Sequence, residues 1–212
     1  MARTAGLLVA LAVAAAPGAR AEQGPFDVLE WDRRAGIVTS RNGQTVWLSL
    51  AAEGHVVRLP GHAGALRGKA AAPVLGATCR AGAGSEAQGE LYLADHPEQP
   101  DAYTVLDPMF WILGLTGGAE ERWPVAVRIG AAPPVGARLV RRLTDYSVPR
   151  PGLAILLPGG AALAALESAR GFRLEVRGAG VAIDATFAPP AAMRRAAALA
   201  RRHCPGSGAA PP

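Results

Sequence analysis

Residue types suited to metal ligation are scarce in this chain of 212 residues, which contains two cysteines and four histidines. A structural zinc site needs about four ligands. No second Cys or His stands at helical or turn spacing from the pair His203-Cys204. The sequence therefore predicts neither a metal site nor a cofactor.

Lysine is almost absent. Lys69 is the only lysine among the 22 basic residues, and alanine, glycine and proline are abundant. This bias indicates GC-rich coding rather than selection for nucleic acid binding. The formal net charge of +5 therefore carries little functional weight, and we expect no nucleic acid partner.

Catalytic motifs are also missing. The chain contains no G-x-S-x-G elbow, no H-E-x-x-H sequence and no P-loop. Gly82-Ala83-Gly84-Ser85 lacks the strand-to-helix context of a nucleophile or phosphate turn, and Glu120-Glu121 is typical of a solvated charge pair. Asp95-His96 resembles half of a catalytic triad, but an adjacent pair alone fixes no geometry. These absences favour a non-enzymatic protein.

Only the first residues contain a hydrophobic run with the features of a targeting segment. Arg3 precedes the apolar stretch from Ala5 to Ala16, Pro17-Gly18 interrupts it, and Ala19-Arg20-Ala21 has the A-x-A form of a cleavage site. Twelve helical residues extend only ~18 Å, short of the ~30 Å hydrocarbon core of a bilayer. We expect residues 1–21 to be a signal peptide and the mature chain to be periplasmic or secreted, without a transmembrane segment.

Short apolar alternations separated by turn residues indicate strands in most of the mature chain. The clearest pattern is a hairpin over 36–50, in which Asn42-Gly43 favours a two-residue type I′ turn. Val46, Leu48 and Leu50 alternate with polar or outward residues after that turn. Six more strands are predicted, at 55–59, 74–80, 90–95, 125–129, 138–143 and 153–157.

The C-terminal third adds helices. An Ala- and Leu-rich stretch predicts a short helix over 161–170 with Gly171 after its end, and a second hairpin follows around Gly178-Ala179-Gly180. Pro189-Pro190 can start a final helix over 191–203. Its arginines gather on one side, opposite an apolar face that we expect to comprise Ala192, Ala196, Leu199 and His203.

These patterns predict a mainly β, α+β fold: an antiparallel β-sandwich with a short helix and a C-terminal amphipathic helix packed on it. Residues 22–204 are long enough for one domain, and residues 22–72 can alternatively form a small N-terminal hairpin module beside a main part at 73–204. The Gly- and Pro-rich tail at 205–212 is expected to be disordered.

The two cysteines of an exported chain are expected to pair, because the periplasm oxidises thiols. Cys79 ends a predicted strand and Cys204 ends the last helix, so their bond would tie that helix to the sheet. A free reactive thiol and a metal site with His203 are the alternatives.

The layout resembles small periplasmic β-sandwich families, namely the type VI secretion accessory family and the invasion-associated locus B family. The resemblance rests on Cys79-Arg80 at the end of a strand, the partner Leu91-Tyr92-Leu93, the strand Val127 to Ile129, and an Ala-rich helix closing on Cys204. It implies a non-enzymatic envelope protein with a helix-covered sandwich and a Cys79–Cys204 disulfide.

Two sets of residues are candidate sites. The apolar run Met109, Phe110, Trp111, Ile112 and Leu113 either fills the core or forms an interaction patch. A second, polar set comprises His55, His62, Asp95 and His96. We expect an exported accessory or protein-interaction protein with an envelope protein as partner. The alternative is a small exported hydrolase or small-ligand-binding protein whose site is built from loops.

Overall fold

The structure is a computed structural model, and it describes residues 24–29, 35–59, 64–65, 72–82, 86–94, 122–144 and 150–204. The predicted signal peptide at 1–21, the apolar run at 109–113 and the tail at 205–212 lie outside these residues. The predictions made for those segments therefore stay predictions.

The described chain is mainly antiparallel β structure, which confirms the predicted fold class. Ten strands form one sheet in the order β1-β2-β4-β5-β8-β7-β6-β9-β10-β3, so the N-terminal strands belong to the same sheet as the later ones. The strands are β1 (Ile37–Thr39), β2 (Thr45–Ala51), β3 (Gly54–Arg58), β4 (Ala72–Arg80), β5 (Gln88–Ala94), β6 (Arg122–Ile129), β7 (Val135–Thr144), β8 (Arg150–Pro158), β9 (Phe172–Gly178) and β10 (Val181–Phe187).

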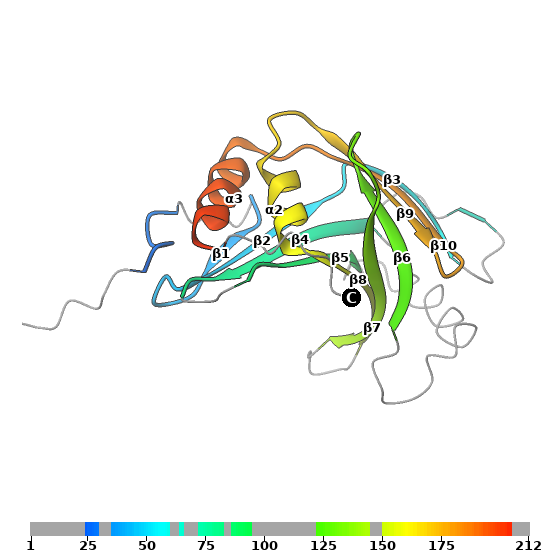
Figure 1. The fold of residues 1–212 in the computed structure, drawn as a ribbon, viewed down its shortest axis with the longest axis horizontal. Helices are drawn as coiled ribbons and strands as arrows, with labels where there is room; N and C mark the ends of the chain where they lie inside the picture. Colours follow the sequence, from blue (N-terminus) through cyan, green and yellow to red (C-terminus); the bar gives the residue numbers. More distant parts are fainter. Residues whose placement is uncertain are drawn as a thin grey trace, which may run out of the picture.

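The sheet is strongly curled, because β2 near one end of the strand order runs almost directly into β3 at the other end. In the short connection, the Ala52 amide donates to the Pro73 carbonyl and the Glu53 amide donates to the Thr186 carbonyl, each at 2.9 Å. These bonds join the chain to β4 and to β10 in turn. Figure 1 shows the result: β1, β2, β4 and β5 form one half of the sheet, and β6, β9, β10 and β3 turn away to form the other.

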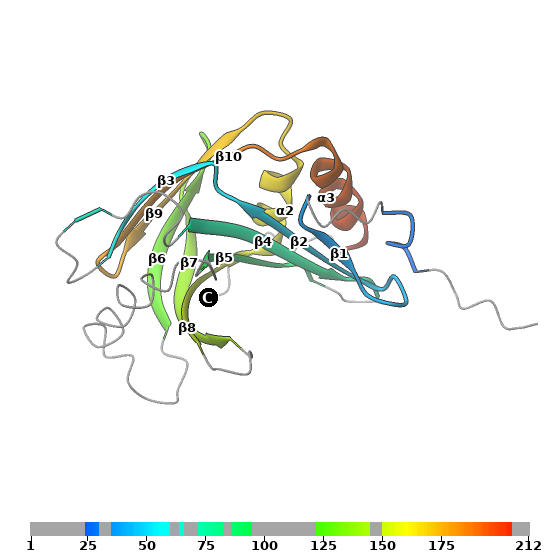
Figure 2. The same ribbon diagram turned by 180° about the vertical axis from the view of Figure 1, so that it is seen from behind.

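Two helices, α2 (Gly159–Glu167) and α3 (Ala191–His203), lie on the same side of β1, β2, β4 and β5, as both views show (Figures 1 and 2). Close packing of α2 depends on Gly89 in β5, where an added Cβ would lie 2.8 Å from the Cβ of Ala162. The predicted helices are confirmed, but the first is shifted. It begins at Gly159 and is capped at Ser168, so Gly171 does not serve as its C-terminal glycine.

The core follows the period of two expected for strands with one covered face. In β2, Val46 and Leu48 are buried while Trp47 between them is exposed. In β4 the alternation holds only near the end, where Cys79 is buried between the half-buried Thr78 and the exposed Arg80, whereas residues 73–77 are all buried. Beneath both helices the buried side chains join into one hydrophobic cluster that includes Met193, Ala196 and Leu163.

The predicted type I′ turn at Asn42-Gly43 is wrong. Strand β1 ends at Thr39 and β2 begins at Thr45, and only Gly43 has a positive φ, at 64°. The turn is longer because Ser40 organises it: the Ser40 hydroxyl donates to Oδ1 of Asn42 at 2.8 Å and accepts from the Thr45 amide at 2.9 Å. Side-chain hydrogen bonds of this kind compete with a tight two-residue hairpin.

A two-residue turn with positive φ at both positions occurs instead between β9 and β10. Ala179 has a φ of 49° and Gly180 a φ of 73°, and the flanking residues Gly178 and Val181 pair across the strands. This geometry is that of a type I′ hairpin, whose twist matches that of the strands.

The buried face of α3 also differs from the predicted one. The fully buried residues are Met193, Ala196, Ala197 and Ala200, whereas His203 is exposed. The His203 ring instead meets Phe26 edge to face, with centroids 5.7 Å apart. The covalent attachment of Cys204 at the end of the helix fixes its rotation, which the arginine pattern alone does not determine.

Candidate binding sites

The covalent link predicted between strand and helix is present. Cys79 on β4 and Cys204 after α3 are joined, with Cα atoms 5.9 Å apart and both side chains fully buried. The pairing leaves neither a free thiol nor a thiolate ligand for a metal at His203. It ties α3 to the end of β4 across a sequence separation of 125 residues.

A polar hollow of about 470 Å³ lies on the opposite face of the same strands. Thr78 pairs with Trp47 of β2 and with Gln88 of β5, and Arg80 pairs with Thr45. These residues alternate with the buried Val46 and Cys79, so they point away from the helices. The polar hollow is lined by Asn42, Gln44, Thr45, Trp47, Thr78, Arg80, Glu86 and Gln88.

The rim of the polar hollow is held by hydrogen bonds. Oδ1 of Asn42 accepts from the Ser40 hydroxyl and from the Gln44 amide, which orients the Asn42 side chain. The Gln44 carbonyl accepts from the Ala81 amide at 2.8 Å, and the Gly43 carbonyl accepts from the Phe26 amide at 3.2 Å. The turn is thus fastened to two other segments, and Cys79 anchors β4 to α3 on the opposite face.

Two exposed apolar side chains, Val38 of β1 and Trp47 of β2, lie next to each other on this face. The large hydrophobic residues that are exposed in the described part of the chain are Val28, Val38 and Trp47, at 80%, 42% and 44%. Val38 is the strand partner of Trp47. Val28 belongs to the separate segment 24–29, whose Phe26 ring contacts His203 of α3. Exposed aromatic and aliphatic groups concentrated in one place are typical of contact surfaces.

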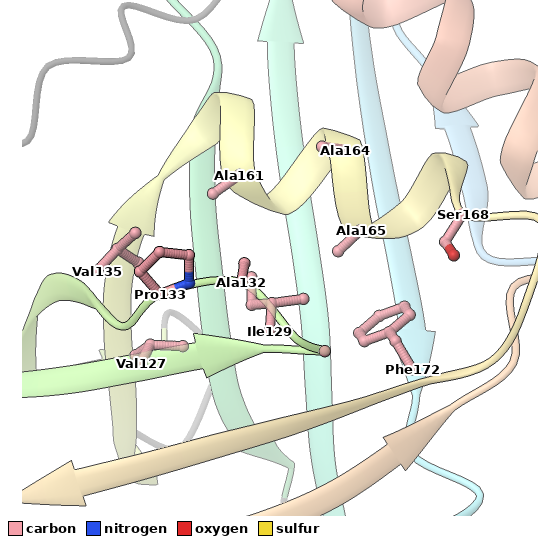
Figure 3. A pocket seen from close by; sticks show the side chains of 11 residues that line it. Val127, Ile129, Ala132, Pro133, Val135, Ala161, Ala164, Ala165, Ser168 and Phe172 are labelled. Atoms are coloured by element: carbon pink, nitrogen blue, oxygen red, sulfur yellow. The ribbon is translucent and has the colours of Figure 1, made fainter.

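A second hollow, the apolar pocket, has a volume of about 310 Å³ and lies between α2, the β6–β7 turn and the start of β9 (Figure 3). Ala161 and Ala165 project from α2 toward Pro133, Ile129 and Phe172. Ser168 carries the only side-chain hydroxyl of the lining, which contains no charged residue. The full lining is Val127, Ile129, Gly130, Ala132, Pro133, Val135, Ala161, Ala164, Ala165, Ser168 and Phe172.

Of the four residues in the predicted polar set, the structure describes only His55. His55 lies on β3 opposite Ala185, and its Nε2 atom is buried without a hydrogen-bond partner. His62, Asp95 and His96 lie outside the described residues, so their clustering stays a prediction. Among the side chains that the structure describes, no three metal-ligating groups lie together.

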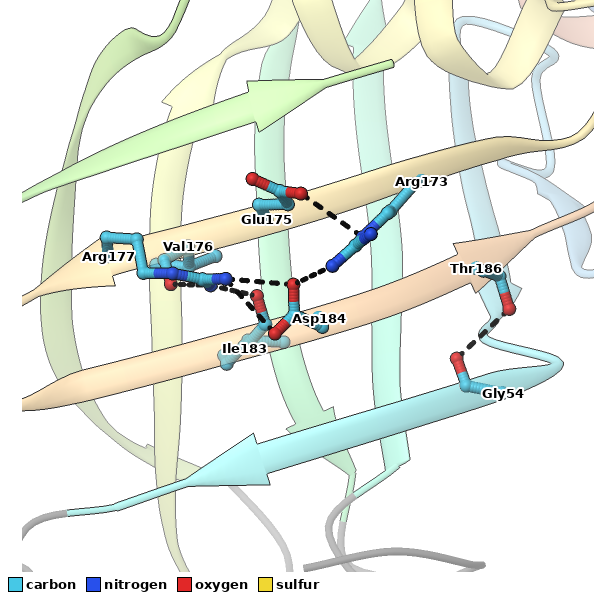
Figure 4. A network of polar contacts seen from close by, with 8 residues as sticks. All are labelled: Gly54, Arg173, Glu175, Val176, Arg177, Ile183, Asp184 and Thr186. Atoms are coloured by element: carbon cyan, nitrogen blue, oxygen red, sulfur yellow. Dashed lines mark hydrogen bonds and ion pairs between the residues drawn. The ribbon is translucent and has the colours of Figure 1, made fainter. Parts of the chain in front are cut away.

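Charged side chains on β9 and β10 form a network of contacts with one another (Figure 4). Asp184 accepts from Arg173 at 2.8 Å and from Arg177 at 2.9 Å, and Arg173 also pairs with Glu175 at 3.1 Å. Burial opposes ionisation of Asp184 most strongly, but the hydrogen bonds and charges of the two arginines outweigh it and lower its pKa. Because these charged groups pair with one another, we interpret the network as a contact that holds β9 and β10 together at the surface.

Sequence reasoning missed both hollows. The exposure of Trp47 could have been predicted from the sequence. Val46, Leu48 and Leu50 alternate with it, so when these three face inward Trp47 faces outward. The apolar pocket had a weaker signal, namely that the predicted helix is apolar on every side. Such a helix has more apolar surface than one sheet can cover.

No protein-family model, curated protein or solved structure matches this chain. Neither helix in the described residues is both long enough and apolar enough to span a bilayer.

Proposed function

We propose that this chain is a non-enzymatic exported protein of the cell envelope that binds a partner protein through the face around the polar hollow. The observation that carries the proposal is Trp47, which is 44% exposed on a face stiffened by the Cys79–Cys204 bond. Tryptophan and arginine are enriched among residues that dominate binding energy, and Arg80 lies on the same face. A rigid face loses little entropy when it binds.

The composition of the face favours a protein partner. Trp47 and Val38 supply adjacent apolar side chains, and amide and hydroxyl groups of Asn42, Gln44 and Thr78 line the polar hollow with Trp47. Arg80 and Glu86 carry opposite charges, so the face has no excess of positive charge for an anionic polymer. Protein interfaces combine exposed aromatic and apolar side chains with polar groups in this way.

Export is part of the proposal and is supported by the paired cysteines, which persist in oxidising compartments. The predicted signal peptide at 1–21 agrees with the same location. Intact mass measurement of the exported product is expected to show a chain that begins at Glu22. A product that retains residues 1–21 contradicts this part of the proposal.

Trp47→Ala tests the binding role. Because Trp47 is 44% exposed, we expect the loss in free energy of unfolding to stay below the about 3 to 5 kcal/mol of a fully buried Trp→Ala change. Binding of the purified protein to envelope preparations from the producing cell should weaken at least ten-fold, as for a central interface residue. Arg128→Ala, a change to an exposed side chain of β6 that lines neither hollow, is the control and should retain binding.

Two results would overturn the proposal. Equal binding by the wild-type protein and Trp47→Ala would show that this face does not contribute to the interaction. Binding that survives protease treatment of the envelope and persists on purified glycan strands would show that the ligand is a carbohydrate rather than a protein.

A further inference from the structure

The apolar pocket has features that a contact face for a protein does not explain. It is hollowed between secondary-structure elements, and its volume of about 310 Å³ falls in the range of small-molecule sites. A cavity of about 150 Å³ already accommodates benzene. We propose that the apolar pocket binds the aliphatic chain of a single-chain amphiphile, independently of the face around Trp47.

The chemistry of the lining defines the part of the ligand that enters. Ser168 offers the only hydroxyl, and that hydroxyl already donates to the Arg170 carbonyl at 2.7 Å. A polar ligand group inside would leave its hydrogen bonds unmade, which is costly. The inserted part is therefore hydrocarbon, and any polar head stays at the mouth.

The architecture keeps the pocket open. Helix α2 is held against β5 through Gly89 and Ala162 on one face, while the alanines at 161, 164 and 165 line the pocket on another. Methyl groups are too short to reach across to β6 and β7. On the far side, Phe172 stacks on Phe187 with centroids 5.3 Å apart, which holds its ring in place.

The rim indicates an anionic head. Arg170 is exposed and stands between the two lining residues Ser168 and Phe172 in sequence. Glu167, the nearest acidic residue along the chain, is paired with Arg201. The Arg170 backbone lies beside the lining, because its carbonyl accepts from the Ser168 hydroxyl, so its exposed guanidinium is the cation we assign to a carboxylate at the mouth, and saturated fatty acids are the appropriate probes.

The experiment titrates the protein with hexanoate, octanoate, decanoate and dodecanoate below their micellar concentrations, with alanine methyl NMR as the readout. Affinity should rise about four-fold for each added methylene until the pocket is full and then level off. Methyl shifts should concentrate at Ala161, Ala164 and Ala165. Affinity that is independent of chain length, shifts elsewhere, or tighter binding of indole than of decanoate would overturn the proposal.

A matched pair of variants tests the location. Ala164 and Ala191 are both exposed helical alanines, but only Ala164 lines the pocket. Ala164→Phe should reduce decanoate affinity more than ten-fold, and Ala191→Phe should leave it unchanged, with unfolding curves recorded for both. If Ala164→Phe does not fold, Ala164→Asp replaces it. Trp47→Ala should still bind decanoate, so failure of this site and failure of the partner face are separable. Equal effects of the two phenylalanine variants contradict the assignment.

Discussion

At the scale of single residues, Cys79 joins the two faces of the sheet. Its sulfur holds α3 on the buried face through Cys204, and its neighbours Thr78 and Arg80 line the polar hollow on the other. The same alternation that buries Val46 places Trp47 outside. A single covalent bond therefore stabilises the fold and restrains the proposed binding face.

Loss of the disulfide is expected to be the most costly change at this scale. Closure of a loop of more than 100 residues corresponds to about 4 to 5 kcal/mol in the chain-entropy model. Cys79→Ala, Cys204→Ala and the double variant should each lower the free energy of unfolding by a similar amount, because one bond is lost in all three. Urea unfolding measures this. Additive losses in the double variant would show that the two residues act separately.

The pairing of Asp184 predicts a small dependence of stability on pH. The pKa of Asp184 is lowered in the folded protein. Its contribution to the free energy of unfolding is therefore present above the usual carboxyl pKa of about 3.9, and it is lost as the pH falls through the lower pKa of the folded protein. Asp184→Asn should cost less than about 1 kcal/mol at neutral pH, since the groups are partly exposed. Urea unfolding between pH 2 and 7 should show the two proteins converging in acid, and a constant difference would refute the assignment.

His55 is expected to destabilise the fold. Its buried Nε2 atom has no hydrogen-bond partner, and such an atom costs about 1 to 3 kcal/mol. His55→Leu should therefore raise the free energy of unfolding by about 1 kcal/mol. A marked decrease in thermal or urea unfolding would show that the imidazole makes a favourable contact.

At the scale of elements, local sequence determined most strands and both helices but not the geometry of the turns. The apolar alternations near Val46 and Leu174 recur in β2 and β9, because one face of each strand is covered. The turn after β1 was mispredicted because Ser40 bonds to it in a way that residue pairs do not reveal. Neither hollow was predicted, since each combines residues from elements that are distant in sequence.

The β9–β10 hairpin contains a strained residue that can be relieved. Ala179 has a φ of 49°, a conformation that costs an L-residue about 1 to 2 kcal/mol and that asparagine adopts more readily. Ala179→Asn should raise the free energy of unfolding by about 1 kcal/mol. Ala188→Asn, at an exposed alanine outside a turn, is the control and should not stabilise the protein. Equal effects of the two changes on thermal unfolding would argue against strain at Ala179.

At the scale of the whole molecule, the two sides of the curled sheet differ in what covers them. In the described part of the chain, both helices lie on one side of β1, β2, β4 and β5, and Trp47 and Gln88 are exposed on the other side (Figures 1 and 2). The apolar pocket lies apart from that face, beside the turn between β6 and β7. The two proposed binding sites therefore lie at separate places on one sheet.

The most direct test of the central claim is site-specific photo-crosslinking in the cells that make the protein. A photoreactive side chain at Gln88, in the polar hollow, should give a discrete crosslinked protein species that Trp47→Ala abolishes. The same group at Ala191, an exposed residue of α3, should give none. A crosslinked species from Ala191 but not from Gln88 would contradict the account, because the partner would then approach the helical side of the molecule.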